Sequence, residues 1–174
     1  LLCLGAIASA GLLFMALASL VFAAAPGRGP EGLALYWGMV AGWEIPAMLI
    51  LPRWLNRQPR PRMLLIGAAV YGAHLALMPV LIATPLIWAL PLVAGFGGAL
   101  LIILPIGYYQ ELMEGQPGIA GALMAVQRLF GDILAAAVFA VGMATGGPGP
   151  TALTGAALAV LGGLALMVVD RRRS

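Results

Sequence analysis

Glu44 is a carboxylic acid inside an apolar segment that is long enough to cross a lipid bilayer. The segment covers residues 33–51, and a spanning helix needs about 20 apolar residues. A charge at the bilayer centre costs about 2.5–3.5 kcal/mol on insertion scales, so such residues usually belong to a substrate, ion or proton pathway. Because apolar surroundings disfavour the charged form of a carboxyl group, Glu44 could take up and release a proton. The alternative is a structural role, with a protonated Glu44 hydrogen-bonded to a neighbouring helix.

Two neighbours of Glu44 indicate what it could bind. Glu44 lies nine residues before Arg53, or about 13 Å along a helix, which places it near the middle of a bilayer. Trp37 lies seven residues earlier, on the same helical face. Pro46 frees a backbone carbonyl one turn before it and could kink the helix. A carboxylate accepts hydroxyl protons and an indole offers a flat apolar surface, so this face would suit a polyol.

A second polar group lies in the apolar segment 118–143. Arg128 and Asp132 are four residues apart, so they share a helical face and can form an ion pair. Pairing reduces the cost of both charges, which would make them a structural pair. Arg128 could instead bind substrate or respond to protonation of Glu44. Gln127 is adjacent and could donate to a substrate hydroxyl.

His74 is the only histidine of the chain and lies within the segment 63–83. A histidine could relay protons, but its own segment holds no other charged group. We therefore interpret His74 as a neutral packing residue. The sequence contains no phosphate-binding loop and no metal-ligand cluster. One His and one Cys do not supply the set of residues that an activated catalytic nucleophile needs. We expect no enzymatic activity and no bound metal.

The composition is that of a polytopic membrane protein. Of the 174 residues, 63% are hydrophobic and only 9% are charged, whereas soluble domains carry about 25% charged residues. The net charge of +3 does not indicate nucleic-acid binding, since all arginines except Arg128 lie at segment ends, where membrane topology explains them. Cys3 is the only cysteine, so no intrachain disulfide can form.

Six apolar segments of about 20 residues follow one another along the chain. They cover residues 1–25, 33–51, 63–83, 86–108, 118–143 and 151–169. Only helices and closed barrels span lipid, because backbone polar groups find no water there. Barrel strands would be about 10 residues long with alternating polarity, so we predict an all-α fold with six transmembrane helices. No charged region precedes the first segment, so we expect a fragment boundary at Leu1 rather than a signal peptide.

The arginines predict the orientation in the membrane. They concentrate in the loop after the second segment and in the C-terminal tail: Arg53, Arg57, Arg60, Arg62, Arg171, Arg172 and Arg173. With six spans these two regions lie on the same side, whereas Arg28 lies on the other side. Because cytoplasmic loops carry the excess of basic residues, we expect this loop, the tail and the loop with Glu111 and Glu114 to be cytoplasmic.

Three motifs resemble those of a known family. They are GWEIPAMLI at 42–50, GYYQELMEGQPG at 107–118 and QRLFG at 127–131. They are similar, in order and spacing, to three motifs of the bacterial sugar efflux transporters, which belong to the major facilitator superfamily. Those motifs are Gly-Leu-Glu-Ile-Pro-x-Met-Leu-Ile, an aromatic-Gln-acidic-Leu-Met-Pro-Gly-x-x-Gly loop, and Ser-Arg-x-x-Gly. The resemblance implies that residues 1–174 form the C-terminal six-helix half of a twelve-helix fold.

The resemblance also implies functional residues. Glu44 and Arg128 match motif positions, and Gln110, Glu111 and Gly115 belong to the motif loop. Asp132 matches no motif position, and its place among the candidates depends on its spacing from Arg128 alone.

The implied activity is export of sugars or small polyols by alternating access between two six-helix halves. Inward proton movement would drive it, with the proton as coupling ion and no other cofactor. The implied partners are membrane lipid, a sugar and an N-terminal six-helix half. The implied location is the bacterial inner membrane, with the C-terminus in the cytoplasm.

Two alternatives stay open at this point. One keeps the transporter but changes the cargo to a drug or another metabolite. The other is a membrane subunit or scaffold that transports nothing.

Overall fold

The prediction of an all-α chain with six long apolar helices is confirmed. The computed structural model describes residues 1–55 and 58–171, and Arg57, Arg172 and Arg173 lie outside them. Within this part of the chain there is no strand, and six helices are long and apolar enough to cross a membrane. They are α1 (Leu2–Ala24), α2 (Gly29–Leu55), α3 (Arg60–Leu81), α4 (Leu90–Leu112), α5 (Pro117–Thr145) and α6 (Pro148–Arg171), with a short 3₁₀ helix, η1 (Pro85–Ala89), before α4.

Several helices are longer than the apolar segments that predict them. The helix α2 begins at Gly29 and ends at Leu55, although the apolar segment covers 33–51. Polar residues can continue a helix beyond the hydrocarbon layer, because their side chains reach water there. Pro46 lies inside α2 without ending it.

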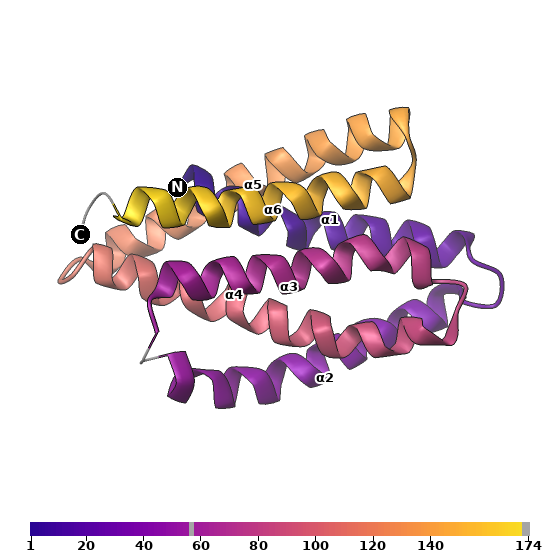
Figure 1. Ribbon diagram of the computed structural model, residues 1–174, viewed down its shortest axis with the longest axis horizontal. Coiled ribbons are helices and arrows are strands. Elements are labelled where there is room, and N and C mark those ends of the chain that lie inside the picture. Colours follow the sequence, from indigo (N-terminus) through magenta and orange to yellow (C-terminus); the bar gives the residue numbers. More distant parts are fainter. Residues whose placement is uncertain (56–57, 172–174) are drawn as a thin grey trace.

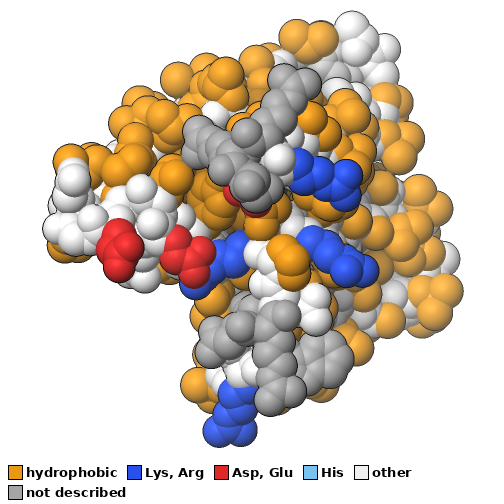
Figure 2. All heavy atoms as spheres, turned by 60° about the vertical axis from the view of Figure 1, so that its left-hand side comes forward, with side chains coloured by type: hydrophobic (Ala, Val, Ile, Leu, Met, Phe, Trp, Pro, Cys, Tyr) orange, Lys and Arg blue, Asp and Glu red, His pale blue; other side chains and the backbone are white. Residues whose placement is uncertain are grey.

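The helices run up and down, so that both termini lie toward the same end of the bundle (Figure 1). That end also holds the connections from α2 to α3 and from α4 to α5, while the other three connections lie at the opposite end. Charged side chains of both signs gather at the end with the termini (Figure 2). The last turns of α2 and α6, which carry Arg53 and Arg171, therefore lie at the same end of the bundle.

The helices differ in how far their own bundle buries them. The helix α1 packs mainly against α5 and α6, α3 against α4 and α6, and α2 against α4. Half of the residues in the most apolar windows of α1 and α4 are buried, compared with 11% in α2 and 17% in α5. The two least buried helices are those that carry Glu44 and Arg128.

Candidate functional site

A cavity of about 380 Å³ contains four of the five predicted pathway residues. Glu44 comes from α2, and Gln127, Arg128 and Asp132 come from α5. Apolar side chains of α1 and α4 form most of the remaining wall, and α3 contributes Tyr71. A small number of polar groups among apolar walls is typical of a small-molecule site.

Glycines of α4 bring Glu44 into this position. A Cβ atom at Gly95 would lie 2.9 Å from the backbone nitrogen of Glu44 and 2.9 Å from the carbonyl oxygen of Val40. The α2 backbone therefore packs directly on α4, as small residues allow in membrane bundles. At Gly98 a Cβ atom would lie 2.5 Å from Oε1 of Glu44. The carboxyl group thus occupies the space that a side chain at residue 98 would fill.

The Glu44 carboxyl group lies in the cavity without a charged partner. Its side chain is half-buried, and no described residue forms a hydrogen bond or ion pair with it. Arg128 lines the same cavity, yet the two groups do not pair. Glu44 is therefore available to a proton or to a ligand.

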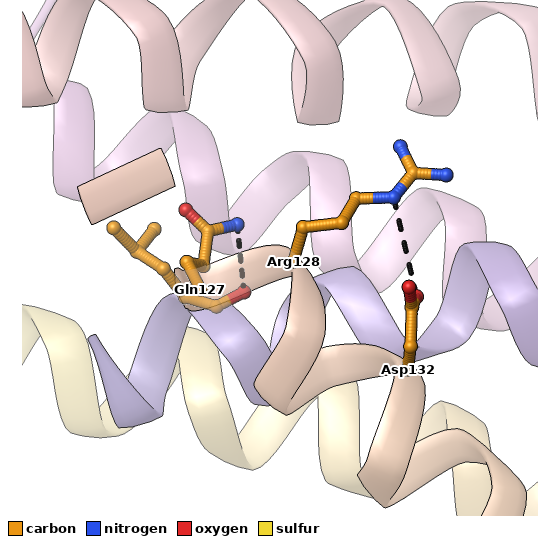
Figure 3. A network of polar contacts seen from close by, with 4 residues as sticks. Gln127, Arg128 and Asp132 are labelled. Carbon is orange, nitrogen blue, oxygen red and sulfur yellow. Dashed lines mark hydrogen bonds and ion pairs between the residues drawn. The ribbon is translucent and has the colours of Figure 1, made fainter. Parts of the chain in front are cut away.

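Arg128 and Asp132 extend from the same side of α5 (Figure 3). The Nε atom of Arg128 lies 4.0 Å from a carboxylate oxygen of Asp132, and 75% of the Arg128 side chain and 41% of the Asp132 side chain are exposed. An ion pair this long and this open contributes little stability. The guanidinium group therefore retains donors for another partner.

Gln127 faces α1 from the preceding position on α5 (Figure 3). Its Nε2 donates a hydrogen bond of 3.4 Å to the carbonyl oxygen of Leu4. The Oε1 atom is buried and has no partner among the described residues. This free acceptor suits a ligand hydroxyl that donates, whereas the sequence led us to expect donation by Gln127.

Trp37 does not line the cavity, although it shares a helical face with Glu44. The cavity reaches Val40 on α2. The Trp37 indole, which is 39% exposed, lies about one turn closer to the start of the helix. Seven residues correspond to about 10 Å along a helix. Trp37 and Glu44 can therefore extend in the same direction from α2 and still lie too far apart to form one site.

The predicted motif loop lies at the end with the termini, away from Glu44. Gln110 and Glu111 are in the last turn of α4, and Gly115 follows with a φ of 77°, which favours glycine. Glu111 forms an ion pair of 2.5 Å with Arg60 at the start of α3. The loop therefore ties α4 to α3 rather than contributing to the cavity.

Sequence reasoning missed a buried polar pair next to the cavity. The Tyr36 hydroxyl and Nε2 of His74 share a hydrogen bond of 2.8 Å, and both residues are fully buried. A signal existed, because Tyr36 and Tyr71 lie within apolar segments and a buried phenol needs a polar partner. The partner could not be named, since it lies on another helix.

No protein-family model, no curated protein and no solved structure matches the chain. Family membership and activity therefore stay predictions that depend on the residues of this chain.

Proposed function

We propose that this chain is a six-helix half of a secondary active transporter that exports sugars or related small polyols by proton antiport. The observation that carries the proposal is Glu44, a carboxyl group without a described partner inside a cavity between membrane helices. An ionisable residue that faces an internal cavity marks a pathway for a substrate or proton.

The composition of the cavity supports a polyol as cargo. Arg128 offers guanidinium donors, while Gln127, Asp132 and Glu44 offer acceptors. The volume of about 380 Å³ lies within the range of about 300–1,000 Å³ that small-molecule sites occupy. Alternating donors and acceptors match the hydroxyl groups of a sugar.

The exposure of α2 and α5 supports a second half opposite this one. Arg128 is 75% exposed within the described chain, and a charge in contact with lipid at mid-depth is costly. A facing N-terminal six-helix half would shield it and complete the cavity, and motion of the two halves would give alternating access. We place the protein in the bacterial inner membrane with its C-terminal tail in the cytoplasm.

Export driven by a pH gradient tests this proposal. Right-side-out vesicles that contain the full-length gene product are loaded with radiolabelled methyl glucoside and diluted into acidic buffer. We expect the gradient to accelerate efflux from the wild type. In Glu44→Gln we expect the acceleration to vanish while exchange of labelled for unlabelled sugar continues, because exchange needs no net proton movement.

The matched control is Glu31→Gln, which neutralises an exposed acid in the first turn of the same helix and should leave the acceleration intact. Full gradient-driven efflux by Glu44→Gln would refute the proton role.

The apolar walls from α1 and α4 favour a second cargo class, amphipathic drugs or metabolites. Gradient-driven drug export without any sugar export would establish that alternative.

A further inference from the structure

The buried Tyr36–His74 pair joins α2 to α3 beside the cavity. In addition to the bond between the Tyr36 hydroxyl and Nε2 of His74, the two rings stack with centroids 6.1 Å apart. The other ring nitrogen, Nδ1, is buried and has no hydrogen-bond partner within the described chain. A purely structural histidine would be expected to satisfy both nitrogens.

Two cavity-lining rings separate His74 from the cavity. The centroids of Phe14 and Tyr71 lie 4.8 Å and 5.4 Å from that of the imidazole, and both residues line the cavity. Tyr71 and Glu44 approach the same point of α4, because a Cβ atom at Gly98 would lie 3.6 Å from the Tyr71 ring and 2.5 Å from Oε1 of Glu44, and both residues line the cavity. The order from the interior to the cavity is Tyr36, His74, Tyr71 and Glu44.

From Glu44 to Tyr36, these four side chains lead toward the end of the bundle that carries Arg28. Tyr36 precedes Glu44 by eight residues on α2, which is about 12 Å along the helix. Trp88 packs on Tyr36 at a centroid distance of 6.4 Å, and the Arg28 guanidinium lies 5.3 Å from the Trp88 ring. The pair therefore lies between Glu44 and the side from which an antiported proton would enter.

Among the described residues, the groups in contact with the imidazole carry no fixed charge. The titratable groups in contact with it are Tyr36 from α2 and Tyr71 from its own helix. The helix α1 contributes Phe14, which does not titrate. On the α6 side, Gly72 and Leu75 of α3 pack against Ala156 and Gly155.

We propose that Tyr36, His74 and Tyr71 relay protons between the Arg28 side and Glu44, an inference that rests on the proposed proton antiport. The Tyr36 hydroxyl passes its proton to Nε2 and takes another from the Arg28 side. Because Nδ1 has no hydrogen-bond partner in the described chain, the imidazole must turn before His74 can release the Nδ1 proton through the Tyr71 hydroxyl to the Glu44 carboxylate. One proton enters for each that leaves, no bond between heavy atoms changes, and a turn of the imidazole restores the first tautomer.

Two variants of the full-length protein separate this relay from a structural role. Tyr36→Phe removes the hydroxyl and keeps the ring contacts. His74→Gln can still bond to the Tyr36 hydroxyl through its amide, but it cannot pass a proton. We expect both to lower pH-driven efflux of radiolabelled methyl glucoside by about a hundredfold, the lower end of what a positioned proton-transfer group contributes. Exchange should stay near the wild-type rate.

Tyr109→Phe is the matched control, because Tyr109 is 1% exposed and lies near the far end of α4. It should leave both rates unchanged. If Tyr36→Phe and His74→Gln keep driven efflux while Glu44→Gln loses it, the relay is wrong and the antiport stands. If the variants lose exchange along with efflux, or if His74→Gln behaves as wild type, the pair is structural. A wild type without gradient-driven export overturns the antiport and the relay together.

Discussion

Glu44 and Arg128 share a cavity without forming an ion pair, as the proposed proton role of Glu44 requires. A carboxylate held by an arginine would stay charged and would resist protonation. Arg128 instead lies near Asp132, at 4.0 Å, so the carboxyl group of Glu44 can change its protonation state. The cavity thereby combines a titratable acid with a guanidinium group that can bind a ligand.

Arg128→Gln tests whether the guanidinium serves ligand binding rather than stability. Because the pair with Asp132 is long and open, its loss should change the free energy of unfolding by less than about 1 kcal/mol. Loss of a charge-assisted hydrogen bond to a substrate removes about 1.5–3 kcal/mol, so sugar affinity should fall about ten- to hundredfold. Thermal unfolding in detergent and equilibrium sugar binding measure the two effects.

Arg62→Gln serves as the control for Arg128→Gln, since it removes an exposed arginine that forms no interaction with any described residue. A large loss of stability in Arg128→Gln with unchanged sugar binding would make the arginine structural.

At the scale of helices, the close approach of α2 to α4 positions the Glu44 carboxyl group. Gly95 and Gly98 lie where the α2 backbone and the Glu44 side chain occupy the space of a side chain. Gly97 plays the same part toward α3, because a Cβ atom there would lie 2.9 Å from the backbone nitrogen of Tyr71. One short glycine-rich stretch of α4 therefore places both Glu44 and Tyr71.

Gly95→Ala should push α2 away from α4, because the added methyl group meets backbone that cannot rotate aside. Such overpacking costs about 1–3 kcal/mol, and the melting temperature and proton-driven efflux should both decrease. Gly38→Ala is the matched control on α2, since nothing lies within 4 Å of its added methyl group. It should stabilise the helix by about 0.5–1 kcal/mol. Equal effects of the two substitutions would contradict this account of the crossing.

At the scale of the molecule, the distribution of charge distinguishes the two ends of the bundle. The end with both termini carries the ion pair of Arg60 and Glu111, together with further exposed charges (Figure 2). At the opposite end Arg28 donates to the carbonyl oxygens of Ile82 and Thr84 at 3.1 and 2.9 Å. These bonds tie the connection from α1 to α2 to the connection from α3 to α4.

Cysteine labelling tests the orientation that the arginines predict. In full-length protein with Cys3→Ser and no other cysteine, Pro26→Cys places a thiol between α1 and α2, and Gln116→Cys places one between α4 and α5. In intact cells a membrane-impermeant maleimide should label the first variant only, and the second should react after permeabilisation. The reverse pattern would invert the orientation, and labelling of both in intact cells would contradict the up-and-down arrangement.

The sequence by itself determined the helices, their number and the residues that are costly in lipid. Hydrocarbon offers backbone groups no hydrogen-bond partners, so apolar segments of this length are helical whatever surrounds them. The spacing of Arg128 and Asp132 likewise predicted their shared face, because both lie on one helix.

Only the tertiary structure decided which groups meet across helices. It placed Glu44 and Tyr71 in one cavity, bonded Tyr36 to His74 and left Trp37 outside the cavity. The periodicity of one helix predicts a direction from its axis, whereas the partner depends on how closely two backbones approach and at what level. In this chain the glycines of α4 set that approach, and they can be interpreted as contact points only once the neighbouring helix is known.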